Sequence, residues 1–192
     1  QLRRARLCPQ AETPEVKGMS MAISAAEQYA LELINRARLD PAGEAARMGI
    51  PLNQGLPSGS FGPISTTPKQ VLAFNIALDT SATRHTNWMV DSGNFSHYGP
   101  NGISPFDRMR DAGYNLNSGG WSAGENLAMA SGSSMSATQA TMALHHRTLF
   151  NSAMHRANMF ADSYREIGIA ESSNGRQSVE TQNFASRSEH RF

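Results

Sequence analysis

The sequence lacks several features that mark whole classes of protein. It has one cysteine, Cys8, among 192 residues, so a framework of intrachain disulfides is excluded. It has no run of about 18 apolar residues, the length a membrane-spanning helix needs. Residues 1–22 contain no apolar segment of the kind that a signal peptide needs, so we identify no export signal in them.

A surplus of charge is also missing. Lys and Arg number 17 and Asp and Glu number 16, which gives a net charge of +1. Binding to phosphate backbones needs a clustered basic surplus, so we expect no nucleic-acid partner. The one basic cluster, Arg3, Arg4 and Arg6, lies in residues 1–20, which show no hydrophobic period and which we interpret as a mobile N-terminal arm.

What is present begins with helical patterns. Ser24 and Glu27 have the spacing of a capping box, and apolar residues recur behind them at helical intervals. Asp40-Pro41 ends that helix, and Pro41 starts a short second helix through Met48. Further helices are expected over residues 68–91, 104–113 and 136–151, the last with Ala140, Ala143, Leu144 and Leu149 facing inward.

Strand patterns dominate the last third of the chain. Residues 123–130 are expected to form a short strand or turn, and residues 164–170 and 179–185 alternate like strands. Asn174-Gly175 between the last two is a strong hairpin signal. Early helices followed by late antiparallel strands predict one α+β domain, with helices packed on a small antiparallel sheet.

Three polar stretches rich in Gly or Ser carry the candidate chemistry. Residues 95–99, 123–128 and 154–159 each offer one side chain of interest, namely His97, Glu125 and His155. His97 precedes Glu125 by 28 residues, and Glu125 precedes His155 by 30, so only the fold can bring them together. Two imidazoles and one carboxyl group can bind a metal ion, transfer protons, or do both.

These stretches resemble motifs of the CAP superfamily (cysteine-rich secretory proteins, antigen 5, pathogenesis-related 1), specifically its bacterial SCP-like branch. The resemblance runs from Leu31 to Phe184 and is carried by residues 95–97, 106–109, 123–128, 152–159 and 164–169. It implies an α-β-α sandwich over residues 21–186, followed by a C-terminal tail over residues 187–192. It also implies a protein that acts outside the cytoplasm, either secreted or periplasmic.

The resemblance further implies that His97, Glu125 and His155 line a surface cleft. In this reading His97 and His155 hold a divalent cation, and we expect Zn²⁺, bound weakly because only two protein ligands are firm. Eukaryotic members place a second glutamate at the position near Ser152, and the bacterial pattern usually has Trp where Leu149 stands. The four-residue site of the animal and plant proteins is therefore incomplete here.

Three functions stay open at this point. The first is a module whose cleft binds a divalent cation together with a small or peptide ligand. The second is a metal-assisted hydrolase of ester, peptide or phosphoester bonds, with His97, Glu125 and His155 as catalytic residues and Glu125 as base or third metal ligand. The third is a lipid or sterol carrier. The sequence contains neither the Gly-x-Ser-x-Gly motif of a serine nucleophile nor the His-Glu-x-x-His motif of zincin metalloproteases. No known catalytic motif therefore favours one of the three functions.

Each site residue also has a structural interpretation. Glu125 could accept backbone N–H groups and organise the loop that follows it, or it could orient a histidine ligand. Arg156 is expected to bind backbone carbonyls or an acidic side chain. His85 is expected at the edge of the core, and the consecutive His145 and His146 are expected at the surface or in packing roles.

Overall fold

The computed structural model describes residues 23–57, 62–117 and 119–187. The arm predicted over residues 1–20, with Cys8, lies outside the described residues, as do residues 188–192 of the predicted tail. The domain limits at 21 and 186 therefore stay predictions. The described residues form α1 (Ala25–Leu39), α2 (Pro41–Met48), β1 (Ala73–Phe74), α3 (Ile76–Ser92), η1 (Pro100–Gly102), α4 (Pro105–Asp111), β2 (Trp121–Ser131), α5 (Gln139–Asn151), α6 (Ala153–Met159), β3 (Glu166–Ser173) and β4 (Gln177–Arg187).

The N-terminal helices form as their local sequence predicts. Ser24 caps α1 through a capping box with Glu27, in which each side chain binds the other's backbone N–H. Asp40 ends α1 and caps α2, where Pro41 occupies the first turn. Gly49 then ends α2 with φ 71°, a left-handed conformation that glycine adopts without strain.

A mixed four-stranded sheet with the order β1-β3-β4-β2 forms the middle of the molecule. The neighbours β3 and β4 are antiparallel and turn at Asn174-Gly175, with Gly175 at φ 83°, as the hairpin signal predicts. Antiparallel pairing also joins β4 to β2, along all of β2 from Trp121 to Ser131, while the two-residue β1 pairs in parallel with β3. The strand β2 is thus an edge strand.

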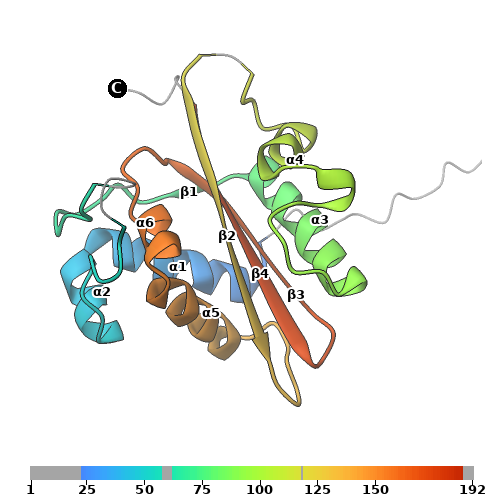
Figure 1. The fold of residues 1–192 in the computed structure, drawn as a ribbon, viewed down its shortest axis with the longest axis horizontal. Coiled ribbons are helices and arrows are strands. Elements are labelled where there is room, and N and C mark those ends of the chain that lie inside the picture. Colours follow the sequence, from blue (N-terminus) through green and yellow to red (C-terminus); the bar gives the residue numbers. More distant parts are fainter. Residues whose placement is uncertain (1–22, 58–61, 118, 188–192) are drawn as a thin grey trace, which may run out of the picture.

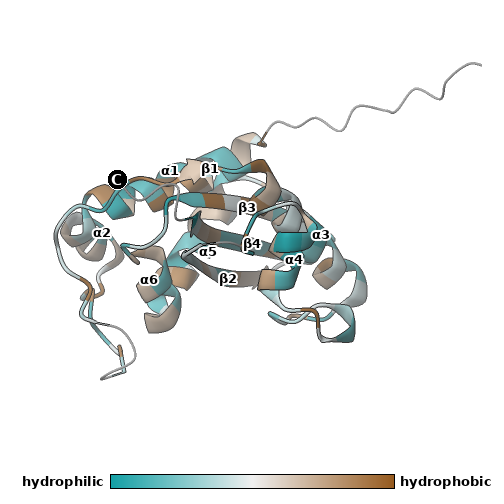
Figure 2. Cartoon of the chain, turned by 90° about the horizontal axis from the view of Figure 1, so that it is seen from above, coloured by the Kyte–Doolittle hydropathy of each residue, from teal (hydrophilic) through white to brown (hydrophobic). Residues whose placement is uncertain are grey.

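Helices cover both faces of this sheet, which makes three layers. Figure 1 shows α1, α2, α5 and α6 on one side of the strands and α3 and α4 on the other. Seen from above, the strands step from β1 through β3 and β4 to β2 between these two groups (Figure 2). The α+β fold with helices on both faces of the sheet is therefore confirmed.

The hydrophobic core is divided by the sheet. The larger cluster lies against α1 and α5 and includes Ile34, Phe150 and Phe184, none of them exposed to solvent. A smaller cluster under α3 and α4 includes Leu78 and Met109. Because side chains alternate between the faces of a strand, β4 contributes Phe184 to the larger cluster and Ala185 to the smaller one, and β2 likewise contributes to both.

One glycine of the sheet is required by a close approach of helix α3. A Cβ at Gly168 in β3 would lie 2.0 Å from the backbone nitrogen of Asp79, well inside van der Waals contact. Only glycine lets α3 approach the sheet this closely. Of the helices in the described residues, none is long and apolar enough to cross a membrane.

The predicted helix over residues 68–91 was wrong at its start. The helix α3 begins at Ile76, where the Asn75 side chain accepts the backbone N–H groups of Ala77 and Leu78. The residues before it run beside β3 instead, and the N–H groups of Ala73 and Asn75 bond to carbonyls of that segment. This pairing is a tertiary interaction that helical periodicity does not report.

The buried face predicted for the fifth helix was also largely wrong. Ala140, Ala143 and Leu144 are exposed, and of the four predicted residues only Leu149 is buried. The buried face of α5 consists of Thr141, Met142, His145, His146, Leu149 and Phe150. Two histidines can lie inside because each has a polar partner there, Ser178 for His145 and Glu44 for His146.

Candidate functional site

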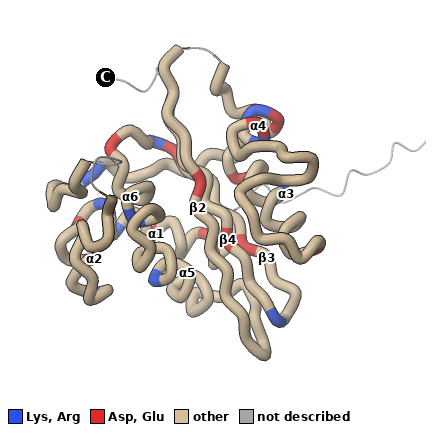
Figure 3. Tube along the Cα trace, in the orientation of Figure 1, with Lys and Arg blue, Asp and Glu red and all other residues tan. Residues whose placement is uncertain are grey.

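The candidate site lies along the edge strand β2. Glu125 is opposite Asn183 of β4, and Asn126 is opposite Gln182, so the side chains of Glu125 and Asn126 point to opposite faces of the sheet. Glu125 is the only acidic residue of β2, and Figure 3 shows that strand running between α6 and α3. Residues from both helical layers can therefore meet at this strand.

On the α4 side, Glu125 joins a histidine and an arginine. Its Oε1 accepts a hydrogen bond from Nδ1 of His97 at 2.8 Å, and its Oε2 accepts one from Nη2 of Arg108 at 2.5 Å. The Glu125 side chain is 2% exposed, whereas that of His97 is 46% exposed. Because a carboxylate only accepts, Nδ1 of His97 carries the proton and Nε2 is the nitrogen left for a ligand.

The partly buried Arg108 and the buried His85 hold the loop that carries His97. Nη1 of Arg108 donates to the backbone carbonyl of His97 at 2.8 Å. His85, 1% exposed, donates from Nε2 to the carbonyl of Ser96 at 2.8 Å. Burial and the positive charge of Arg108 lower the pKa of His85, which keeps that ring neutral. The position of His97 is thus fixed both through its side chain and through its backbone.

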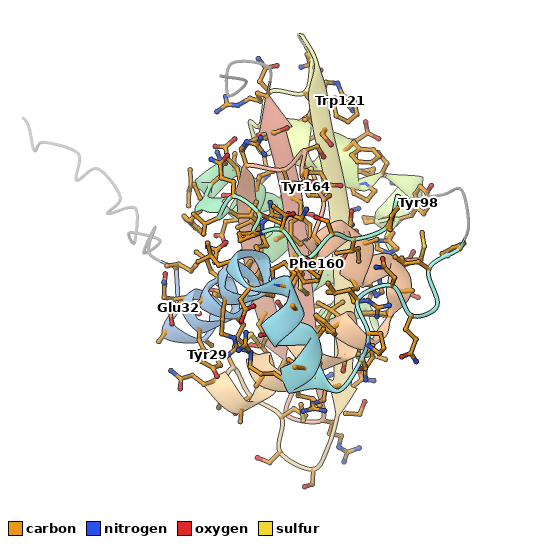
Figure 4. The ribbon with its side chains drawn as sticks, turned by 90° about the vertical axis from the view of Figure 1, so that its left-hand side faces the viewer. Tyr29, Glu32, Tyr98, Trp121, Phe160 and Tyr164 are labelled. Carbon is orange, nitrogen blue, oxygen red and sulfur yellow. The ribbon has the colours of Figure 1, made fainter. Side chains whose placement is uncertain are left out.

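Ser96 beside His97 has a structural role. Its hydroxyl accepts the backbone N–H of Tyr98 at 3.0 Å, which forms a short turn. Tyr98 itself is 60% exposed and lies at the periphery of the molecule, whereas Phe160 and Tyr164 lie near its middle (Figure 4).

On the α6 side, a network of neutral side chains fastens β2 to the helix that carries His155. Nδ2 of Asn126 donates to the carbonyl of His155 at 3.1 Å, and Nδ2 of Asn158 donates to the carbonyl of Glu125 at 3.2 Å. Tyr164 donates its hydroxyl hydrogen to Oδ1 of Asn158 at 2.9 Å. The backbones of Glu125 and His155 are therefore held by one hydrogen-bonded unit.

His155 is partly buried beside this network. Burial lowers its pKa, and a proton on His97 lowers it further, which favours the neutral imidazole that metal ions bind. Among the described residues no group of three or more His, Cys, Asp and Glu side chains is placed to hold a metal ion.

Some residues of the site had no role in the sequence analysis. Arg108, Asn126 and Asn158 all lie within the motif stretches quoted above, yet arginine and asparagine in polar segments are most often surface residues. Arg156, by contrast, was expected to be structural, and it is. It is fully buried and donates to the backbone carbonyls of Leu52, Phe150 and Gln54.

Comparison with solved structures places the fold among known ones. NaASP2, solved with Zn²⁺, superposes with a TM-score of 0.53 at 15% identity, over 87% of this chain and 82% of that one. An outer surface protein of Borrelia burgdorferi gives a TM-score of 0.50 at 15% identity, over 60% of this chain and 77% of that one. These likenesses concern the fold alone.

A longer bacterial protein also matches part of the chain. An extracellular protein of Bacillus anthracis that contains an SCP domain is 25% identical, with a TM-score of 0.47, over 60% of this chain. The match covers only 34% of the Bacillus protein. No curated protein matches this chain significantly.

The sequence itself matches one family model. The model describes the cysteine-rich secretory protein family, called CAP, and it matches residues 31–185. That span runs from within α1 to within β4 and includes His97, Glu125 and His155. The chain therefore belongs to the CAP family of cysteine-rich secretory proteins.

Proposed function

We propose that His97 and His155 bind a divalent cation at the edge strand, with Glu125 as the residue that orients His97. The observation that carries this proposal is the bond from His97 Nδ1 to a buried carboxyl group that is itself held by Arg108. A histidine ligand typically donates its second ring N–H to a carboxylate or carbonyl, which fixes the tautomer and makes the free nitrogen a better ligand.

The donor set suits Zn²⁺. Neutral imidazoles are among its preferred ligands, and the lowered pKa of His155 keeps that ring unprotonated near neutral pH. Two protein ligands leave positions open and give weak, exchangeable binding. A bound divalent cation supplies a Lewis acid that polarises an oxygen of a small or peptide ligand.

Exposed apolar side chains next to both histidines support a ligand in addition to the ion. Phe95, Tyr98 and Met154 are 45%, 60% and 45% exposed, and each lies within two residues of His97 or His155. Where exposed apolar side chains form one contiguous patch, the patch typically marks a contact area. We propose that they contact the ligand that the cation holds.

A hydrolase is the second candidate, with a changed role for Glu125. Both oxygens of Glu125 are engaged, by His97 and by Arg108, so it is poorly placed to serve as third ligand or general base of a metal-assisted reaction. Without a metal ion on its Nε2, His97 would be the proton acceptor and Glu125 the residue that orients it. The lipid or sterol carrier stays a prediction, which mass spectrometry of solvent extracts from purified protein would test.

We also propose that the protein acts outside the cytoplasm, secreted or in the periplasm. The support is the family, whose description names secretory proteins. Localisation of the full-length protein by cell fractionation tests this.

The test of cation binding is calorimetric titration of metal-free protein with ZnCl₂. We expect one weak site per chain, lost in His97→Ala and in His155→Ala and kept in the control Glu32→Gln, which changes an exposed residue of α1. Equal zinc binding by wild type and both alanine variants would overturn the proposal. Ester, peptide and phosphoester substrates, tried with Glu125→Gln as control, test the hydrolase candidate.

A further inference from the structure

The hydrogen-bonded unit behind the candidate site continues into the middle of the sheet. Nδ2 of Asn126 also donates to Oε1 of Gln182 at 3.3 Å, and Nε2 of Gln182 donates to Oε1 of Glu180 at 2.8 Å. Asn126 is opposite Gln182 in the register of β2 and β4, and Glu180 lies two residues away on the same face of β4. All three residues are buried. A buried polar network therefore joins the site to β4.

The hydrogen bonds of this network all point the same way. The Tyr164 hydroxyl donates to Oδ1 of Asn158 at 2.9 Å, and Nδ2 of Asn158 donates to Oδ1 of Asn126 at 3.1 Å. The bonds from Asn126 to Gln182 and from Gln182 to Glu180 continue in that direction. Reversing one amide would set two NH₂ groups or two carbonyl oxygens against each other, so each amide fixes the orientation of the next. Bonds aligned in this way also polarise one another.

The network supports two elements that have little other support near the site. The strand β2 is an edge strand, and the seven-residue helix α6 has no side-chain hydrogen bond at its N-cap, Ser152. By contrast, β4 is paired on both sides, with β3 and with β2. Because Asn126 donates to the carbonyl of His155, the network ties the start of α6 to this central strand.

We propose that Gln182 is a positioning residue of the candidate metal site and that Glu180 holds Gln182 in the required orientation. The inference rests on the proposed cation site, since it concerns how the backbone of His155 is held for binding. Within the described residues Gln182 bonds to neither candidate histidine, so it acts through the amide of Asn126.

The protonation state of Glu180 gives this network a measurable pH dependence. Burial raises the pKa of Glu180 to about 7, and the charges of Glu171 and Glu27 add to this against the hydrogen bond that Glu180 accepts. Glu171 is opposite Glu180 on β3, Glu27 belongs to α1, and the buried His145 of α5 packs on the same face of β4. An ionised carboxylate accepts a stronger hydrogen bond than a neutral one. The bond from Gln182 should therefore tighten as the pH rises through about 7.

The first test is NMR of the side-chain NH₂ groups in metal-free protein. We expect the signals of Gln182 and Asn126 to shift together between about pH 5 and about pH 9, with a midpoint of about 7. Glu180→Gln keeps an acceptor oxygen for Gln182 but cannot ionise, so it should abolish the shift and leave Asn126 in place. Signals that do not titrate, or that titrate equally in Glu180→Gln, overturn the proposal.

The second test is calorimetric titration of variants with ZnCl₂. Gln182→Met removes a partner of Asn126, and Glu180→Met removes the acceptor that holds Gln182. Both should weaken zinc binding about fivefold, less than is typical for a group that bonds to a metal ligand directly. Glu180→Gln should bind zinc as the wild type does. So should the control Thr181→Val, which removes a buried bond from Thr86 on the opposite face of the same strand.

The variants separate positioning from folding. Circular dichroism shows which of them fold, and if Gln182→Met does not, Glu180→Met and the NMR titration decide. Equal zinc affinities in Glu180→Met and Glu180→Gln, or an equal loss in Thr181→Val, overturn the positioning role. A wild type that shows the NMR titration but binds no zinc would overturn the cation site, whereas zinc binding without the titration would overturn the role of Glu180 and Gln182.

Discussion

The molecule contains two clusters built from the same residue types, a glutamate bound by arginine and histidine. In the first, Glu44 of α2 accepts bonds from Arg36, Arg47 and His146 of α5, at 2.7 to 2.9 Å. In the second, Glu125 accepts from Arg108 and His97. Both glutamates are buried, yet His146 is 2% exposed and His97 is 46% exposed.

This difference in exposure separates a structural cluster from a binding site. Burial raises the pKa of Glu44, but the hydrogen bonds from His146, Arg36 and Arg47 outweigh it and hold that pKa well below its usual range. The His146 ring is enclosed, so the cluster fastens α5 to α2 and can do little else. At Glu125 the histidine partner is His97, whose exposed ring has Nε2 left for a ligand.

The largest effect is expected from removing the charge of Glu44. Glu44→Gln leaves two arginines and a buried histidine without their carboxylate, and we expect a loss of about 3–5 kcal/mol in the free energy of unfolding. Glu125→Gln should lose only about 1–2 kcal/mol, because His97 is half exposed. Urea unfolding followed by circular dichroism measures both. Equal losses would show that exposure of the histidine does not separate the clusters.

A third buried glutamate, Glu180, sharpens the comparison because, within the described residues, its hydrogen-bond partner is the neutral side chain of Gln182 and not a cation. Burial, together with the charges of Glu171 and Glu27, raises its pKa to about 7 against the hydrogen bond from Gln182. The folded state therefore keeps this proton where the unfolded state has lost it, and stability falls as the pH rises from about 4.5 through about 7.

Glu180→Gln should thus stabilise the protein by about 3 kcal/mol at about pH 8 and leave it unchanged at about pH 4. Unfolding free energies measured across this pH range test it. An equal gain in stability at about pH 4 and about pH 8 would show that the effect does not come from the titration of Glu180.

Replacing each of the two histidines by glutamine separates an effect on folding stability from an effect on zinc binding. His146→Gln removes a buried bond to Glu44 and should cost about 1–3 kcal/mol of stability. His97→Gln should change stability by no more than about 0.5 kcal/mol, while it removes zinc binding. Thermal unfolding and zinc titration of both variants provide the two readouts. The account is contradicted if His97→Gln destabilises as much as His146→Gln does.

The smallest effect is expected from Arg108→Lys, a change in the residue that holds Glu125. Arg108 bonds to both the Glu125 carboxyl and the His97 carbonyl, and a single ammonium group cannot reproduce that fork. We expect zinc affinity to fall by about tenfold. Arg110→Lys is the matched control, since Arg110 is on the same helix and pairs with the exposed Asp107. Equal zinc affinities of the Arg108→Lys and Arg110→Lys variants would show that Arg108 does not contribute to zinc binding.

Features encoded by neighbouring residues could be predicted from the sequence. The start of α1 follows from Ser24 and Glu27, and the β3–β4 turn follows from Asn174-Gly175. The beginning of α3 could not be predicted, because the segment before it is fixed by pairing with β3. The buried face of α5 depends on Ser178 and Glu44, 33 and 102 residues away from the histidines they bind.

The candidate site divides in the same way. His97, Glu125 and His155 came from motifs and a family resemblance, and the structure brings His97 onto Glu125. That Glu125 has both oxygens engaged could not be foreseen, because Arg108 reaches it only through the fold. The structural alternative considered for Glu125, that it orients a histidine, is the one that this geometry favours.

The central claim is that Glu125 fixes the tautomer of His97 and leaves Nε2 for a metal ion. Long-range ¹H–¹⁵N NMR of the histidine rings, with and without Zn²⁺, tests it most directly. The account predicts that His97 carries its proton on Nδ1 and that zinc shifts Nε2 of His97 and one nitrogen of His155, leaving His145 and His146 unchanged. A proton on Nε2 of His97, or zinc-induced shifts confined to other histidines, would contradict it.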